Sequence, residues 1–176
     1  MLNGSVEMEE DRPRRRDAAI GTAVFFLVAP GVVGGLVPWL LTGWRVASPF
    51  PSWAPLRLVG AVLVGVGVLV LVPAFVQFAM EGIGTPAPVA PTERLVVGGL
   101  YRYVRNPMYL AVLSIIVGQA LVLGQPGLLV YAAVVALAFG IFVAAYEEPT
   151  LHRRHGAEYD AYRQAVPAWW PRLRRR

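Results

Sequence analysis

The sequence predicts an all-α integral membrane protein with about four transmembrane helices, and three observations support this fold class. Of the 176 residues, 56% are hydrophobic and 15% are charged, whereas soluble domains average about 45–50% apolar and about 25% charged residues. The apolar residues form long uncharged runs that are separated by polar stretches. Every one of the 16 basic residues is an arginine, and most arginines lie at the chain ends or beside the apolar runs, as topology signals do.

The composition also excludes several kinds of chemistry. The chain has no lysine, which excludes a Schiff-base mechanism, and no cysteine, which excludes thiolate nucleophiles and cysteine metal sites. Its two histidines, His152 and His155, are too few for a histidine-based metal site, so no metal is expected. The net charge of +5 could suggest nucleic acid, but the arginines are placed for membrane topology and anionic lipid headgroups. We therefore expect membrane lipids, and no nucleic acid, as partners.

The N-terminal part of the chain predicts a polar tail followed by a first membrane helix. Residues 1–17 are charged and have no core-forming pattern, so we expect them to form a cytoplasmic tail. The uncharged run that follows is longer than the apolar region of a signal peptide, which has about 7–15 residues. It therefore predicts a retained helix at about residues 18–41. Tryptophans and prolines are frequent in residues 44–55, which predicts a loop at the membrane boundary.

Two further apolar stretches predict three more helices. Residues 58–80 carry no charge and are long enough to span roughly 30 Å of hydrocarbon at about 1.5 Å per residue. The connection that follows is rich in proline and glycine, which predicts irregular backbone. No charge then appears between Asn106 and Tyr146, and the turn sequence Gly-Gln-Pro-Gly at residues 124–127 splits this run. The run therefore predicts a helical hairpin of residues 108–123 and 127–146.

The last part of the chain, residues 151–176, predicts an interfacial segment that follows a transmembrane domain of residues 18–150. Apolar and aromatic residues recur at helical spacing from Leu151 to Tyr162, so we expect a short amphipathic helix on the membrane or against the hairpin. Arginines lie at both termini and in the long connection between the second and third helices. The positive-inside rule then places these parts in the cytoplasm, and the expected location is a bacterial inner membrane.

Residues 98–109 are a polar, aromatic and arginine-bearing stretch between long apolar runs. Pro107 suits the first turn of a helix, and Asn106 before it is a plausible N-cap. Two interpretations stay open on physical grounds alone. The arginines and tyrosines of this stretch can serve as topology signals and as an interfacial aromatic belt, or they can form a binding site.

Glu147 and Glu148 follow the last apolar run, and Pro149 is expected to end the helix just beyond them. Carboxylates at a helix C-terminus face the negative end of the helix dipole, which disfavours them. They are either solvated at the interface or paired with a cation. The candidate cations are Arg102, Arg105, Arg153, and the ammonium or sulfonium group of a ligand.

Several short motifs follow one another in order over residues 84–171. They are Leu95-Val96, Gly99-Leu100-Tyr101, Arg105-Asn106-Pro107-Met108-Tyr109, Glu147-Glu148-Pro149-Thr150-Leu151, Gly156-Ala157-Glu158-Tyr159-Asp160-Ala161-Tyr162 and Val166-Pro167. This ordered set resembles the isoprenylcysteine carboxyl methyltransferase family and the related phospholipid methyltransferases. That family has an Arg-His-Pro-x-Tyr block, a helical hairpin, and then Glu-Glu-x-x-Leu and Gly-x-x-Tyr-x-x-Tyr.

The resemblance implies an integral membrane methyltransferase that uses S-adenosyl-L-methionine and acts on a hydrophobic or amphipathic acceptor. The hairpin and the C-terminal segment would form a cytoplasmic cofactor pocket. Carried over by position, the residues of this pocket would be Leu95, Val96, Tyr101, Arg105, Asn106, Pro107 and Tyr109, with Glu147 holding the polar end of the cofactor. The candidates for a general base are Glu148, Tyr109, Tyr101 and His152, and a strong nucleophile would need none.

Two residues depart from the family pattern. Asn106 stands where the family usually has histidine, and asparagine cannot serve as a titrating base near neutral pH. Val143 stands where the carboxyl methyltransferases have an arginine for the substrate carboxylate, so that carboxylate is not the expected acceptor. The methylated atom is then O, N or S of an unassigned acceptor. The alternatives are phospholipid N-methylation and a non-catalytic membrane scaffold that kept the fold, and the sequence carries no signal of oligomeric state.

Overall fold

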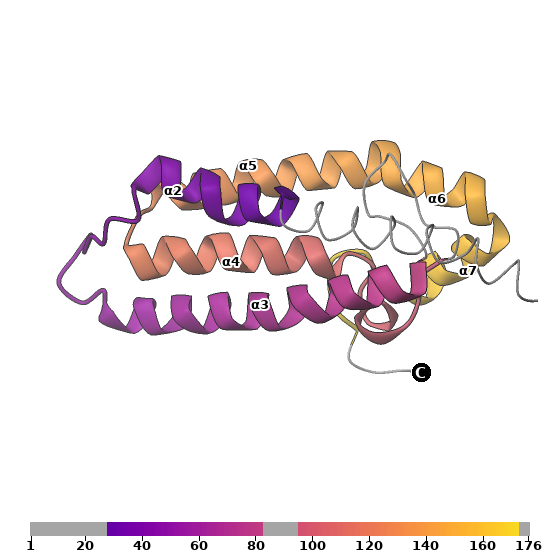
Figure 1. Ribbon diagram of the computed structural model, residues 1–176, viewed down its shortest axis with the longest axis horizontal. Coiled ribbons are helices and arrows are strands. Elements are labelled where there is room, and N and C mark those ends of the chain that lie inside the picture. The colour runs from indigo at the N-terminus through magenta and orange to yellow at the C-terminus, as the bar shows by residue number, and fades with distance from the viewer. Residues whose placement is uncertain (1–27, 83–94, 173–176) are drawn as a thin grey trace, which may run out of the picture.

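The computed structural model describes residues 28–82 and 95–172, and the regular structure in these two ranges is helical throughout. The elements are the π-helical turn η1 (Val32–Leu36), α2 (Val37–Thr42), α3 (Ala54–Gly82), the 3-10 turn η2 (Gly99–Arg102), α4 (Pro107–Leu123), α5 (Gly127–Phe142), the π-helical turn η3 (Val143–Glu147), α6 (Glu148–His155) and α7 (Ala157–Ala165). Figure 1 shows α3, α4 and α5 running side by side, with α6 and α7 at the end of the bundle where α4 begins. The predicted all-helical fold is confirmed for these residues.

Two of the predicted helices correspond to α4 and α3, and the helix predicted at 127–146 extends further than expected, to His155. The predicted hairpin helix of residues 108–123 is α4, which begins one residue earlier. The helix predicted at 58–80 is α3, which begins at Ala54 because Pro55 occupies the first turn, where proline loses no hydrogen bond. An apolar helix covers Val28–Thr42, the end of the helix predicted at 18–41. The predicted polar tail of residues 1–17, and residues 18–27, lie outside the described residues.

The expectation that Pro149 ends the last apolar helix was wrong. α5, η3 and α6 form one continuous helix, Gly127–His155. A proline inside a helix crowds the carbonyl four residues before it and cannot donate the usual hydrogen bond. That carbonyl belongs to Ala145, inside the π-helical turn η3. Because a π-helical turn bonds five residues back, it accommodates the ring without ending the helix.

The structure after residue 147 also differs from the single amphipathic helix that we expected, because it contains two helices, α6 and α7. α6 continues the line of α5, and the chain turns at Gly156 before α7 begins. Gly156 has φ +50° and ψ −123°, a conformation that glycine adopts without the steric cost of a Cβ atom. His152 Nδ1 lies 2.9 Å from Asp160 Oδ1 across this turn. α7 therefore folds back toward the start of α4, as Figure 1 shows.

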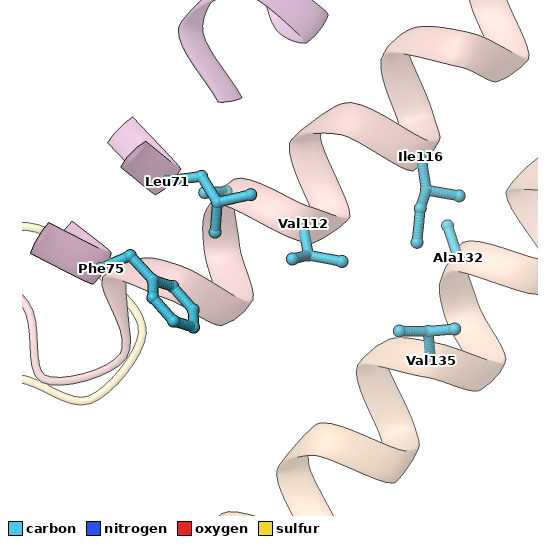
Figure 2. Close-up of a cluster of buried hydrophobic side chains, with 7 residues drawn as sticks. Leu71, Phe75, Val112, Ile116, Ala132 and Val135 are labelled. Atoms are coloured by element: carbon cyan, nitrogen blue, oxygen red, sulfur yellow. The ribbon is translucent and has the colours of Figure 1, made fainter. Parts of the chain in front are cut away.

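The core lies where α3, α4 and α5 meet. Figure 2 shows Leu71 and Phe75 from α3, Val112 and Ile116 from α4, and Ala132 and Val135 from α5, which belong to one cluster of buried side chains. Small residues bring α3 and α4 into close contact, because a Cβ atom on Gly60 would lie 2.6 Å from the carbonyl oxygen of Gly118. Close backbone approach through small residues is a common way for helices to associate in membranes.

The loop between α2 and α3 covers the turn of the α4–α5 hairpin. Trp53 Nε1 donates to the carbonyl oxygen of Leu121 at 2.7 Å, and the amide nitrogen of Ala47 donates to that of Leu123 at 2.7 Å. These donors satisfy carbonyls at the C-terminus of α4 that have no partner within the helix. Gln125 Nε2 in turn donates to the carbonyl oxygen of Arg45 at 3.0 Å. The loop predicted at residues 44–55 is therefore an ordered cover, and it ends at Trp53.

Within residues 28–82 and 95–172, two helices are long and apolar enough to cross a membrane. They are Ala54–Gln77, with a mean hydropathy of 2.7, and Gly127–His155, with a mean hydropathy of 2.6. Large apolar side chains on both helices point away from the bundle, and Leu58, Leu69 and Val130 are each about 70% exposed (70%, 73% and 67%). Soluble monomers rarely expose apolar surface of this extent. The outer faces of α3 and α5 are therefore suited to lipid.

Candidate functional site

The turn η2 supports the polar residues at the end of the bundle that holds α6 and α7. It is fixed against α3 on one side and α7 on the other. Gly99 begins η2 with φ +48°, and a Cβ atom at this position would collide with the side chain of Gln77 in α3. Tyr101 is buried with Val96 against Ala74 of α3. The hydroxyl of Tyr162 in α7 donates to the carbonyl oxygen of Tyr101 at 2.7 Å. η2 is thus held from both sides before α4 begins.

Residues 166–172, here called the C-terminal segment, run along residues 103–106. The amide nitrogen of Arg105 donates to the carbonyl oxygen of Pro167 at 2.9 Å, and that of Arg172 donates to the carbonyl oxygen of Tyr103 at 2.9 Å. Asn106 is buried, and its Nδ2 donates to the carbonyl oxygen of Ala168 at 3.2 Å. Asn106 holds the N-cap position of α4, but its side chain does not cap the helix as expected. Its amide binds the C-terminal segment instead.

Glu148 is neutralised by two arginines from different parts of the chain. Its Oε1 lies 2.9 Å from Nη1 of Arg105, and its Oε2 lies 3.5 Å from Nη2 of Arg163 in α7. Arg105 Nη1 also donates to the hydroxyl of Tyr159 at 3.0 Å. Burial, and next the charge of Glu148, raise the pKa of the Tyr159 phenol, which therefore stays protonated at neutral pH. This ion-pair cluster joins the start of α4 to α6 and α7.

Glu147 has a different environment from its neighbour. The hydroxyl of Tyr109 donates to Glu147 Oε2 at 2.9 Å. The Tyr109 ring packs on Phe139 of α5 with 4.5 Å between ring centroids, and it lies 6.3 Å from the ring of Trp169 in the C-terminal segment. Among the residues that the structure describes, Glu147 makes no ion pair. The Glu147 carboxyl group is thus held beside a phenol and aromatic rings.

The two glutamates do not lie at a helix end, so the expected unfavourable interaction with a helix C-terminus does not arise. The helix continues to His155, and Glu148 lies in the first turn of α6. Of the expected partners, Arg105 binds Glu148, whereas Arg102 lies over the ring of Tyr103 at 4.9 Å and Arg153 donates to Thr150. The free-energy cost that remains for these two carboxylates comes from their partial burial near lipid.

The structure brings together some of the sequence-predicted site residues and separates others. Those at one place are Arg105, Asn106, Pro107, Tyr109, Glu147 and Glu148. Val96 and Tyr101 pack together against Ala74 of α3, in a cluster that Met108 of α4 also contacts, and Leu95 is half-buried. His152 pairs with Asp160 at the surface.

Four residues of this end were missed as site residues by sequence reasoning: Tyr159, Tyr162, Arg163 and Trp169. The helical spacing of Tyr159 and Tyr162 was a usable signal, because it places both on one face of a helix. Arg163 and Trp169 carried no such signal, since an arginine and a tryptophan near a membrane are common without a site. Val143, at the position of the family arginine, is buried in the bundle with 4% of its surface exposed.

An apolar cavity of about 210 Å³ lies beside this site. It is lined by Ala29, Pro30, Val33, Leu71, Phe75, Met108, Tyr109, Val112, Phe139 and Phe142. These residues come from the Val28–Thr42 helix, α3, α4 and α5. Tyr109 contributes to the cavity wall and also binds Glu147. The cavity and the carboxylate therefore meet at one side chain.

The fold and this end of the bundle define an all-helical protein with membrane-length helices and a cluster of arginine, carboxylate and tyrosine side chains. The sequence matches the family described as phospholipid methyltransferase over residues 56–158. The chain belongs to this family, and the resemblance drawn from the motifs is confirmed. No curated protein and no solved structure matches the chain. The family and the apolar helices together indicate a membrane methyltransferase.

Tyr162→Phe is expected to loosen the end of the bundle without unfolding it. The substitution removes the donor to the carbonyl oxygen of Tyr101, at a cost of about 1–3 kcal/mol if that carbonyl is left unsatisfied. Amide hydrogen exchange of residues 95–106 should then become faster, while that of α4 stays the same. Tyr146→Phe, at an exposed tyrosine of η3, is the matched control. Equal exchange in the two variants would contradict a structural role for the Tyr162 hydroxyl.

Proposed function

We propose that the protein is an integral membrane methyltransferase that uses S-adenosyl-L-methionine and methylates O, N or S of a hydrophobic or amphipathic acceptor. In this proposal four helices span the membrane. Two are the long apolar helices that begin at Ala54 and Gly127, and the other two are α4 and the helix that ends at Thr42. We keep the three parts expected from the sequence: a cytoplasmic tail of residues 1–17, a transmembrane domain of residues 18–150, and an interfacial segment of residues 151–176 that completes the cofactor site. The α6–α7 end then faces the cytoplasm, where its arginines satisfy the positive-inside rule.

The single observation that carries the proposal is the unequal environment of the two adjacent glutamates. Arg105 and Arg163 neutralise Glu148. Glu147, among the described residues, contacts only the neutral hydroxyl of Tyr109 through its carboxylate. A carboxylate held near lipid without a cation is costly. A cationic ligand would relieve this cost, and S-adenosyl-L-methionine carries both an ammonium and a sulfonium group.

The residues present fit this cofactor. Arg105 Nε is buried without a hydrogen-bond partner among the described residues, so an acceptor atom of a ligand that reached it would satisfy this donor. Arg105 and Asn106 bind the C-terminal segment and Pro107 is buried behind them in the first turn of α4, which would exclude water from that side. Leu95, Val96 and Tyr101 would form the more distant, apolar part of the pocket. In this arrangement the protein contributes alignment and water exclusion.

When bound, S-adenosyl-L-methionine supplies an electrophilic methyl group on its sulfonium sulfur. In the transfer, the acceptor atom would bond to this carbon as the carbon–sulfur bond breaks, with S-adenosylhomocysteine as the leaving group. A proton on the acceptor must then pass to a base or to water. The Tyr109 hydroxyl lies at the cavity wall and would relay such a proton toward water, whereas Glu147 is assigned to the cationic cofactor. Glu148 is held in its ion pairs and Tyr101 by its burial against α3, so each is the weaker candidate.

Phospholipid N-methylation is the second candidate function, because the matched family is described as phospholipid methyltransferase. The two candidates differ in their product. Purified protein in lipid nanodiscs is incubated with methyl-labelled S-adenosyl-L-methionine and a crude lipid extract. Label in phosphatidylethanolamine-derived lipids supports the second candidate, and label in other amphiphiles supports the broader proposal. Absence of both methyl transfer and calorimetric cofactor binding would leave a membrane scaffold as the function.

A further inference from the structure

The end of the bundle that lies away from α6 and α7 is positively charged in the part of the chain that the structure describes. Arg45 lies in the loop of residues 43–53, which joins α2 to α3, and Arg57 lies in the first turn of α3. Figure 1 shows this loop at the opposite end of the bundle from α6 and α7. The sequence has no aspartate or glutamate in residues 18–80 or 94–146. The elements that meet at this end therefore bring two arginines and no carboxylate.

Arg57 is held at the start of a helix that is otherwise uncharged and long enough to cross a membrane, Ala54–Gln77. Its Nη2 donates to the carbonyl oxygen of Ala47 at 2.9 Å and to the hydroxyl of Ser48 at 2.8 Å. Both partners are neutral, and Arg57 Nε is buried without a hydrogen-bond partner among the described residues. A cation in the first turn of a helix also faces the positive end of the helix dipole. An anion beside this guanidinium would therefore be stabilising.

Arg45 belongs to the same short loop. Its main chain is fixed, because its carbonyl oxygen accepts from Gln125 Nε2 at 3.0 Å. Its side chain lies beside Gly43, where an added Cβ atom would be 3.8 Å from Arg45 Nε. Within the described residues this side chain makes no ion pair. Ala47, which contacts the guanidinium of Arg57, follows two residues later, so the loop carries one arginine and binds the other.

Exposed aromatic side chains flank the two arginines. Trp44 is 56% exposed and Phe50 is 48% exposed, and the ring of Phe50 packs edge-on against Trp53 with 4.9 Å between centroids. Tryptophan is enriched at the level of the lipid headgroups, where its ring is partly in hydrocarbon and partly in water. Arginine binds phosphate through two parallel hydrogen bonds and stays charged at any physiological pH. The loop therefore combines the residue types that suit the phosphate of a lipid.

We propose that residues 43–53 and the start of α3 bind the headgroup of an anionic phospholipid, with Arg45 and Arg57 as the ligands of its phosphate. A zwitterionic headgroup would bring an ammonium group, for which this end offers no carboxylate, so an anionic headgroup is favoured. The site lies in the leaflet opposite the candidate methyl-transfer site, so the lipid bound there is a structural partner. It stabilises the loop that covers the α4–α5 turn. The inference does not depend on methyl transfer.

The test measures amide hydrogen exchange of residues 43–53 in the full-length protein. The protein is placed in nanodiscs of phosphatidylcholine with increasing fractions of phosphatidylglycerol, and exchange should slow as phosphatidylglycerol is added. In Arg45→Gln the fraction that gives half of this slowing should rise about fivefold, the factor that one arginine contributes near an anionic surface. Arg153→Gln is the matched control, because it removes an exposed arginine of α6 at the opposite end. It should leave the half-effect unchanged.

A second pair of variants separates the charge of Arg57 from its structural contacts. Arg57→Gln and Arg57→Lys both alter the bonds to Ala47 and Ser48, but only lysine keeps the charge. Each variant is compared with itself in pure phosphatidylcholine, so a general loosening of the loop cancels. Arg57→Lys should respond to less phosphatidylglycerol than Arg57→Gln does.

Three outcomes would overturn the inference. The first is exchange of residues 43–53 that does not depend on phosphatidylglycerol. The second is the same half-effect in Arg45→Gln and Arg153→Gln, which would mean that the bilayer charge acts on the protein as a whole. The third is equal slowing by inorganic phosphate in phosphatidylcholine nanodiscs, which would mean that the arginines bind a soluble anion and need no lipid.

Discussion

Glu147→Gln is expected to weaken the binding of S-adenosyl-L-methionine by about ten- to hundredfold and to abolish measurable methyl transfer. The substitution keeps the size of the side chain and its contact with Tyr109 but removes the negative charge. A hydrogen bond to a charged group contributes about 1.5–3 kcal/mol, and each 1.4 kcal/mol corresponds to about tenfold in affinity. The dissociation constant is measured by calorimetry on the purified protein in nanodiscs.

Glu158→Gln is the control for this experiment. Glu158 lies exposed in the first turn of α7 at the same end of the bundle, so its substitution removes the same charge from the same face. The affinity of the Glu158→Gln variant for the cofactor should stay within about twofold of that of the original protein at physiological ionic strength, because exposed charges are screened under these conditions. Equal weakening by the two substitutions would mean that the general charge of this face, rather than a specific contact with Glu147, attracts the cofactor.

Gly60→Leu is expected to destabilise the bundle by on the order of 3 kcal/mol. A Cβ atom at this position would lie 2.6 Å from the carbonyl oxygen of Gly118 and 2.8 Å from the amide nitrogen of Val122. Both atoms belong to the backbone of α4, which cannot move aside as a flexible side chain can. The two helices must therefore separate, which also weakens the core cluster that they share. Unfolding in detergent, followed by circular dichroism, measures the effect.

Gly65→Leu is the matched control within the same helix. A Cβ atom on Gly65 would meet no atom within 4 Å. The substitution removes a glycine from a helix interior, which favours the helix by up to about 1 kcal/mol. Unfolding of this variant should therefore be unchanged or require more detergent. If Gly60→Leu and Gly65→Leu behaved alike, the close approach of α3 and α4 would not limit stability.

The helices could be predicted from the sequence because their cause is local. An uncharged run between polar stretches favours a helix in a membrane, since backbone groups must be satisfied within the segment. The boundaries of α4 follow from Pro107 at one end and Gly124 at the other, where φ is +65°. The family could also be predicted, because an ordered set of motifs along the chain requires no knowledge of contacts.

The prediction that Pro149 ends the helix was wrong because it considered the proline without the backbone geometry of the turn before it. The preceding turn widened to a π-helical turn, so the helix passed through to His155. Asn106 likewise met the local requirements of an N-cap, but its buried amide found the carbonyl of Ala168 instead. The partner of Asn106 is thus distant in sequence, whereas the helix at Pro149 continues because of the geometry of the turn just before it.

The sequence by itself determined the apolar helices, the hairpin, the family and which residues carry polar groups, because each depends on composition and order along the chain. Only the tertiary structure decided how the two neighbouring glutamates differ. Arg105 and Arg163 come from the start of α4 and from α7, and both reach Glu148, while Glu147 faces Tyr109. Electrostatic and hydrogen-bond partners act over a few ångströms, so their choice depends on which elements meet in space.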